Sequence, residues 1–394
     1  MARANVESNR SAHWRGAAQV IALVRREPGI TRAAAAQRLT MSSGSMTEVA
    51  ARLREVRLLA EAPAPAGGRG RPTTVLRSHP AGPLALAAEI RQEDWRCCIA
   101  ALDGKTHLLE SGRHGSRSPD SVLAALRRAI GRARQRYGER IGVVSLAVSG
   151  TVRADRLVQA ATLGWGSVDL TTLTDASGPK LLVGNDATLG GVAESRNGAA
   201  AGAGTALHVL VEVGVGGSLV VDGQPIVGAT GAGGEYGHLP FGDGGRLCPC
   251  GARGCWDLEV DGRALARHLG EAPPADPRTY TREILDRASA DPHAQRALGA
   301  VGTALGAGIA GLVNSHDPEI VTIGGLAISL RAAAPAEFGA AYVDGLMAFQ
   351  RATPPRVVDA THGDDGALNG AVAVGLDHIT SEAALAAWAD RTPS

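Results

Sequence analysis

One glycine-rich segment, residues 228–257, constrains this 394-residue chain more than any other stretch; it reads GATGAGGEYGHLPFGDGGRLCPCGARGCWD. Its candidate metal ligands are His238, Cys248, Cys250 and Cys255. One imidazole and three thiolates form the closed ligand set of a structural zinc site. Gly251 and Gly254 would let the backbone fold around an ion. The alternative, three free core cysteines beside an unrelated histidine, stays open, but the spacing predicts structural zinc.

The same segment places a carboxylate close to the predicted metal. Glu235 stands three residues before His238, so a metal that holds the histidine would also hold this carboxylate for the hydroxyls of a polyol. A second polar pair, Asn185 and Asp186, follows an apolar strand and opens a helix. The pair either caps that helix or provides Asp186 as a hydrogen-bond acceptor or general base for a sugar hydroxyl.

The charge of the chain is divided unevenly. Residues 1–80 hold thirteen Arg and five Glu, a net charge of +8, and because the whole chain is +1 the remainder is −7. A basic segment on an acidic body favours a polyanionic partner for that segment alone, although a solvated charged face remains an alternative.

The pattern of residues 1–80 predicts a winged helix-turn-helix. An apolar stripe ends at Pro28, a second helix begins at Thr31 as N-cap, and a third begins at Ser42 or Ser43. Strands at residues 57–61 and 73–77 flank the loop APAPAGGRGRP, as in an arginine-tipped wing. The candidate DNA contacts are Ser43, Ser45 and Thr47 on the third helix and Arg69 and Arg71 in the wing. Each serine or threonine is equally interpretable as an N-cap or solvent-facing residue.

After residue 84 the pattern changes to strands alternating with helices, which predicts an α/β body of two lobes facing a cleft. We expect a first lobe at residues 84–200 and a second at 201–385, with the C-terminal helix returning to the first. Residues 297–315 are long and uncharged enough to suggest a membrane span. Their large apolar residues share one helical face, so we predict a buried core helix.

These motifs together resemble the ROK family (repressors, open reading frames and sugar kinases) and, within it, repressors of the xylose and N-acetylglucosamine type. The resemblance covers the chain from the winged helix through two actin-like, ribonuclease H-like lobes to the zinc loop. It implies zinc ligation by His238, Cys248, Cys250 and Cys255. It implies sugar contacts from Asn185, Asp186, Glu235, His238 and Asp257, the last standing where the family usually has Glu.

Two departures from the kinases of the family favour a regulator. The kinase turn DxGGTK, whose glycines admit ATP phosphates, corresponds to residues 89–94, where both glycines are missing. We expect Glu93 and Asp94 to repel a triphosphate there. The second phosphate loop, usually GTGIGG, reads EVGVGG at residues 212–217.

The sequence therefore predicts a sugar-responsive transcriptional regulator, a repressor, that is no enzyme. It would bind operator DNA as a homodimer or dimer of dimers and take a sugar or sugar phosphate as effector. Two alternatives remain: an active ATP-dependent sugar kinase with Asp186 as base, and a DNA-binding protein whose body serves only for dimerisation. Five cysteines without a disulfide framework, and a start without the apolar run of a signal peptide, lead us to expect a cytoplasmic protein.

Overall fold

The computed structural model describes the chain apart from residues 1, 65–73, 117, 161–162 and 393–394. The chain forms two compact units. The first unit comprises Met1–Leu146, Asp169–Val183 and Ala371–Ser394. The second comprises Ala147–Val168 and Gly184–Gly370. Each unit is therefore built from separate stretches of the chain.

The first unit begins with three helices and a pair of strands: α1 (Ala2–Arg26), α2 (Arg32–Arg38), α3 (Ser43–Glu55), β1 (Leu59–Pro63) and β2 (Thr74–Ser78). Thr31 caps α2 as predicted, since its side chain accepts a hydrogen bond from the amide of Ala34. Ser42, rather than Ser43, caps α3 by accepting from the amide of Ser45. The two strands pair antiparallel, and the predicted strands overlap both of them.

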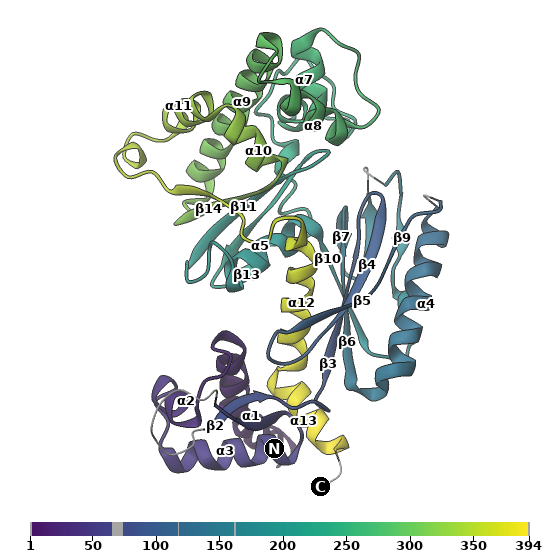
Figure 1. Cartoon of the computed structure of the whole chain (residues 1–394), viewed down its shortest axis with the longest axis vertical. Coiled ribbons are helices and arrows are strands. Elements are labelled where there is room, and N and C mark those ends of the chain that lie inside the picture. The colour runs from purple at the N-terminus through teal and green to yellow at the C-terminus, as the bar shows by residue number, and fades with distance from the viewer. Residues whose placement is uncertain (1, 65–73, 117, 161–162, 393–394) are drawn as a thin grey trace. The chain divides into compact units, whose positions relative to one another are not determined.

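These elements share a core with the C-terminal helix α13 (Glu382–Arg391). Ile21 of α1 and Met46 and Leu53 of α3 are at most 1% exposed. The indole of Trp388 in α13 donates a hydrogen bond to the carbonyl of Val56, the residue that ends α3. Since the chain's last helix packs against its first, the C-terminal helix returns to the start of the chain (Figure 1).

A five-stranded sheet forms the rest of the first unit, in the order β10-β6-β3-β4-β5. Its strands are β3 (Leu84–Ile90), β4 (Asp94–Ala100), β5 (Thr106–Arg113), β6 (Ile141–Val148) and β10 (Lys180–Asn185). Helix α4 (Pro119–Tyr137) covers one face, and α12 (Gly366–Ile379) lies on the other face (Figure 1). Gly375 of α12 approaches Ala85 and Ser145 so closely that an added Cβ would lie 3.1 Å from the Cβ of Ala85.

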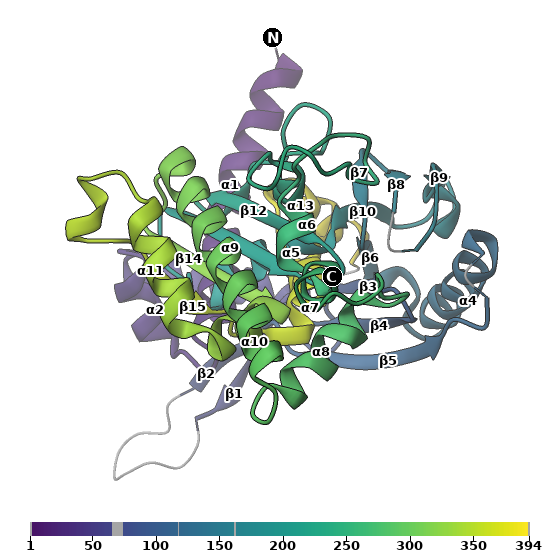
Figure 2. The ribbon, with the colours of Figure 1, turned by 90° about the horizontal axis from the view of Figure 1, so that it is seen from above.

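The second unit contains another five-stranded sheet, in the order β13-β12-β11-β14-β15. Its strands are β11 (Thr205–Val211), β12 (Val215–Val221), β13 (Gln224–Pro225), β14 (Ile320–Gly325) and β15 (Arg356–Asp359). Helix α5 (Asp186–Asn197) packs on β11 and β12. Helices α6 (Asp257–Val260), α7 (Gly262–Leu269), α8 (Pro277–Arg287), α9 (Pro292–His316), α10 (Leu326–Ala333) and α11 (Pro335–Gly345) also belong to this unit. Figures 1 and 2 show α9, α10 and α11 grouped on the face of the sheet opposite to α5.

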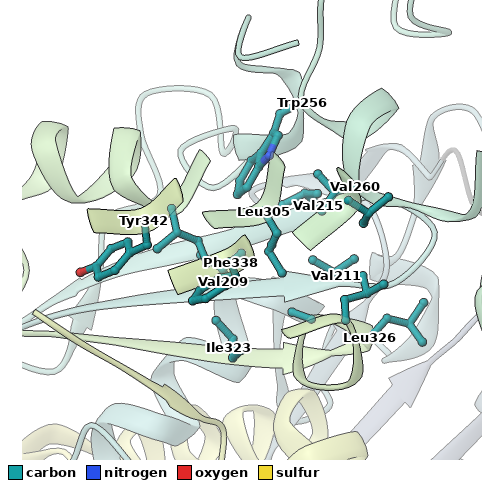
Figure 3. Packing of buried hydrophobic residues seen from close by; sticks show 14 of the residues in the cluster. Val209, Val211, Val215, Trp256, Val260, Leu305, Ile323, Leu326, Phe338 and Tyr342 are labelled. Carbon is teal, nitrogen blue, oxygen red and sulfur yellow. The ribbon is translucent and has the colours of Figure 1, made fainter. Parts of the chain in front are cut away.

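Helix α9 occupies the centre of the second core. It is long and apolar enough to cross a membrane, but Val301, Leu305 and Ile309 on its sheet-facing stripe are fully buried. Figure 3 shows Leu305 among side chains of the sheet and of α10 and α11, including Val209, Ile323 and Phe338. The prediction of a buried core helix for residues 297–315 is therefore confirmed.

A small antiparallel sheet, unforeseen from the sequence, follows β6. It consists of β7 (Thr151–Arg153), β8 (Arg156–Gln159) and β9 (Val168–Asp169). Gly150 just before β7 has no room for a side chain, because an added Cβ would lie 2.5 Å from the carbonyl oxygen of Gln159. The tight turn presents Ser149 and Thr151 at the mouth of the second unit's pocket.

Candidate functional site

The four predicted metal ligands meet in one cluster. The ligand atoms of His238, Cys248, Cys250 and Cys255 all lie within 4.8 Å of one another. The sulfurs of Cys250 and Cys255 are 3.6 Å apart, and the sulfur of Cys248 is 4.0 Å from Nδ1 of His238. A tetrahedron with zinc–sulfur bonds of ~2.3 Å has edges of about 3.8 Å. The cluster therefore has the composition and the spacing of a tetrahedral zinc site.

The burial of the Cys255 thiol is consistent with metal binding. Burial raises the pKa of Cys255 to about 12, so a thiolate at this fully buried position needs a cation beside it. Nδ1 of His238 is the ring nitrogen next to the sulfurs, which leaves Nε2 for a molecule in the adjoining pocket. The histidine can thus join a metal site to a ligand site.

That pocket lies within the second unit and has a volume of about 410 Å³, which suits a small polar ligand. The five predicted sugar-binding residues all line it: Asn185, Asp186, Glu235, His238 and Asp257. They come from the start of α5, the glycine-rich loop and the start of α6. The fold thus brings together residues that are separated by up to 72 positions in the sequence, from Asn185 to Asp257.

Asn185 performs the capping role that the sequence left open. Its side-chain oxygen accepts a hydrogen bond from the amide of Thr188 at 3.0 Å, and its amide group donates to the carbonyl of Gly150 at 3.0 Å. Asp186 starts the helix, accepts from the hydroxyl of Ser149, and accepts from the amide of Ala187 at 2.9 Å. Burial raises the pKa of Asp186, and the nearby charge of Glu235 raises it further. A buried carboxyl with a raised pKa suits a hydrogen-bonding or general-base role.

Glu235 and Asp257 are also held by specific contacts. The hydroxyl of Thr151 donates to Oε1 of Glu235 at 2.7 Å. Oδ1 of Asp257 accepts from the amide of Val215 at 2.7 Å, and its Oδ2 lies 3.7 Å from Nδ1 of His238. Only glycine fits at position 237, since an added Cβ would lie against Oδ1 of Asp257. This contact explains the glycine between Glu235 and His238.

Several pocket residues were missed from the sequence: Ser149, Thr151, Gln159, Glu212 and Arg263. A run of small hydroxyl residues directly after the apolar strand β6 is a signal that could have found the first two. Glu212 was noticed only as a lost glycine of a phosphate loop. In the structure Glu212 is among the residues that line the pocket, and its Oε2 lies 2.6 Å from Nε of Arg278 in α8.

Glu212 has an unusual environment. Burial raises its pKa to about 7, against the lowering effect of Arg278. Its Oε1 lies above Gly325, where φ is +61° and an added Cβ would be 2.7 Å away. The carboxylate of Glu212 therefore occupies the space beside this glycine.

The turn between β3 and β4 differs from the expectation in its electrostatics. Arg91 donates two hydrogen bonds to the carboxylate of Asp94, at 2.7 and 2.8 Å, and Arg113 donates to Glu93 at 2.8 Å. Because each acidic side chain has an arginine partner, the repulsion of a triphosphate expected from Glu93 and Asp94 is largely neutralised. The expectation that this turn does not bind phosphates then depends on the absence of glycines at residues 89–94.

The predicted DNA-contacting residues are described in part. Ser43, Ser45 and Thr47 are exposed on the first turns of α3. The hydroxyl of Ser45 lies 2.9 Å from that of Ser42, and the hydroxyl of Thr47 donates to the carbonyl of Ser43. These local bonds exchange readily with other partners at an exposed site. Arg69 and Arg71 lie outside the described residues.

Comparisons with known proteins agree with this architecture. The model of the ROK family matches residues 86–378. A kanosamine kinase of Amycolatopsis mediterranei is 34% identical over 60% of this chain and 75% of its own length. The xylose repressor of Bacillus subtilis is 26% identical over 65% of this chain and 67% of its own length.

A solved structure extends the likeness in fold to almost the whole chain. It is a ROK family transcriptional regulator, a homologue of the E. coli MLC protein, with a TM-score of 0.75 and 21% identity. The match covers 96% of this chain and 99% of the regulator's chain, so it extends beyond residues 86–378, which the family model matches. Kinases and regulators therefore both occur among the relatives, and the chain is a member of the ROK family.

Proposed function

We propose that this protein is a sugar-responsive transcriptional repressor. Residues 1–80 would form a winged helix-turn-helix that binds operator DNA, with Ser43, Ser45 and Thr47 of α3 at base edges or phosphates and Arg69 and Arg71 in the wing. Residues 84–200 and 201–385 would form the two lobes of the sensor. A dimer would read paired half-sites.

The observation that carries the proposal is the additional N-terminal module. Three helices, two of them with N-caps, and an antiparallel strand pair precede the residues matched by the family model, and they share the fold of a ROK regulator. Their segment carries a net charge of +8 on a chain of +1. A sugar kinase has no use for a compact basic module of this kind, whereas a DNA-binding protein does.

The pocket of the second unit supports the sensing half of the proposal. Asn185, Asp186, Glu235, His238 and Asp257 would bind the effector, and His238 with the three cysteines would hold zinc. A metal on His238 fixes one end of the loop that carries Glu235, so ligand contacts depend on an ordered loop. Coupling between an effector site and DNA typically amounts to ~1 to 3 kcal/mol, which changes operator affinity 5- to 150-fold.

The experiment combines two measurements on the full-length protein. Fluorescence anisotropy would measure binding to the DNA upstream of its own gene, and thermal stabilisation would screen hexoses, pentoses and their amino and phosphorylated forms. We expect specific DNA binding that a stabilising sugar alters at least fivefold. DNA binding no better than to a scrambled duplex would contradict the regulator. Stabilisation by no sugar would contradict the sensor.

A second candidate is an ATP-dependent sugar kinase. Two observations favour it: the 34% identity to a kanosamine kinase, and the raised pKa of Asp186, a carboxyl placed to act as base. A coupled assay for ADP release with the same sugar panel tests it. Sugar-dependent turnover at saturating sugar that Asp186→Asn abolishes would establish the kinase; we expect none.

A further inference from the structure

The charges that line the pocket of the second unit are unequal. Among the described residues, its wall carries one guanidinium, that of Arg263, which already pairs with Asp261 through a hydrogen bond of 2.6 Å. Against it stand four carboxylates: Asp186, Glu212, Glu235 and Asp257. The wall therefore has an excess of negative charge before any ligand enters.

Asp186 lies close enough to two of the other carboxylates for their charges to repel. The charge of Glu235 acts on Asp186, and the charge of Asp186 acts on Glu212. Each effect raises the pKa of the group that experiences it, because a second negative charge nearby disfavours ionisation. A cation placed among them would relieve this repulsion, and an anion would increase it.

Of the four carboxylates, Glu212 has the fewest hydrogen bonds from the described part of the protein. The charged groups that face it are Arg278 and Arg282 of α8, Asp364, and Asp186 of α5. Its Oε2 lies 2.6 Å from Nε of Arg278, yet neither atom makes a hydrogen bond of acceptable geometry within the described structure. A carboxylate has about four acceptor positions, so Glu212 keeps acceptor capacity beside its ion pair with Arg278 and can accept from a ligand that donates.

We propose that Glu212 selects the ligand by charge, so that the pocket prefers a sugar bearing an ammonium group to a neutral sugar and rejects sugar phosphates. The inference deepens the proposed function and rests on it, since it names the class of effector for the same pocket. An ammonium that donates to this carboxylate makes a charge-assisted hydrogen bond, which is roughly twice as strong as a neutral one. We expect the preference over the neutral sugar to be about tenfold.

Isothermal titration of the full-length protein near neutral pH tests the inference. The probes are D-glucosamine and 3-amino-3-deoxy-D-glucose, which carry the ammonium at different carbons, together with D-glucose and D-glucose 6-phosphate. We expect one amino sugar to bind about tenfold more tightly than glucose, and glucose 6-phosphate to bind more weakly than glucose. Titration in two buffers of different ionisation enthalpy should show proton release on binding, because the cation favours ionised Glu212.

Two substitutions should shift the preference in opposite directions. Glu212→Gln keeps the size of the side chain and removes its charge, so the preference for the amino sugar should fall to within about twofold of glucose. Arg278→Gln removes the partner that partly neutralises Glu212, so the preference should increase once the pH exceeds the pKa of this carboxyl, which the loss of Arg278 raises further. Glu271→Gln is the control, because Glu271 pairs with Arg287 and lies outside the residues that line the pocket.

The outcomes separate the inference from the function on which it rests. Charge selection would be overturned, and the sensor left intact, if glucose binds as tightly as both amino sugars. The same holds if Glu212→Gln keeps its melting temperature and still prefers the amino sugar to glucose. Tighter binding of glucose 6-phosphate would also overturn it. If none of the probes nor any sugar of the wider panel binds, the sensor and the inference fail together.

Discussion

Replacement of Cys250 by serine should show how much the metal, as distinct from apolar packing, contributes to the order of its loop. Cys250 is exposed, so serine removes a metal ligand without leaving a cavity in the core. Apolar packing anchors the two ends of the loop, since Tyr236 and Trp256 belong to the core of the second unit, whereas the cysteine-bearing part adds only a small buried cluster of Cys248, Cys255 and Leu258. Loss of one ligand from a four-ligand site should release the zinc and free the loop.

The magnitude follows from the two ligand-binding residues on that loop. Glu235 and His238 each offer a charged or metal-polarised hydrogen bond, worth ~1.5 kcal/mol or more when made. Loss of both amounts to about 3 kcal/mol, which is a more than hundredfold weaker sugar affinity. Binding of DNA through residues 1–80 should persist, but without a response to sugar.

Zinc content, sugar titration and DNA anisotropy measured on the same preparation provide the assay. The control is Cys97→Ala, which removes a buried thiol of β4 outside the cluster and should leave zinc and sugar affinity unchanged. A zinc-free Cys250→Ser protein that binds sugar as tightly as the original would refute the role of the metal in holding Glu235 and His238.

Four further predictions concern separate parts of the chain. Replacing Arg69 and Arg71 with alanine should weaken DNA binding irrespective of sequence and reduce the slope of log affinity against log salt by about one to two, as measured by anisotropy at several salt concentrations. Ser42→Ala removes the N-cap of α3, at a cost of about 1 kcal/mol, and should accelerate hydrogen exchange of the first turn, whereas unchanged exchange would contradict the cap. Asp186→Asn should reduce sugar affinity without changing zinc content. Because the folded state raises the pKa of Glu212 from 4.5 to about 7, it binds the extra proton and loses stability as pH rises through this range. The melting temperature of Glu212→Gln should decline less over that range, and parallel curves for the two proteins would exclude the shift.

Much of the local structure was predictable because it depends on patterns of residues that are close together in the sequence. The amphipathic run at residues 119–137 forms helix α4, and the apolar run at residues 141–148 forms strand β6. The N-cap at Thr31 was predictable because a hydroxyl before a helical run satisfies an amide within three residues.

Other features could not be predicted from the sequence, because they depend on contacts between residues that are far apart in the chain. The strands β7, β8 and β9 have two to four residues each, too short for a periodic signal. The repulsion expected from Glu93 and Asp94 ignored Arg91 and Arg113, whose approach is a property of the folded hairpin. Asn185 was ambiguous because one amide can cap a helix and line a pocket at once.

The sequence by itself determined the four candidate metal ligands and the conclusion about family. Both are properties of residue type and spacing within one short loop, and a loop of glycines around three cysteines and a histidine has few other uses. Only the tertiary structure decided the electrostatic character of the pocket. Glu212 comes from a hairpin, Asp186 from the start of α5 and Arg278 from α8, and charge interactions depend on distance in space rather than on separation along the chain.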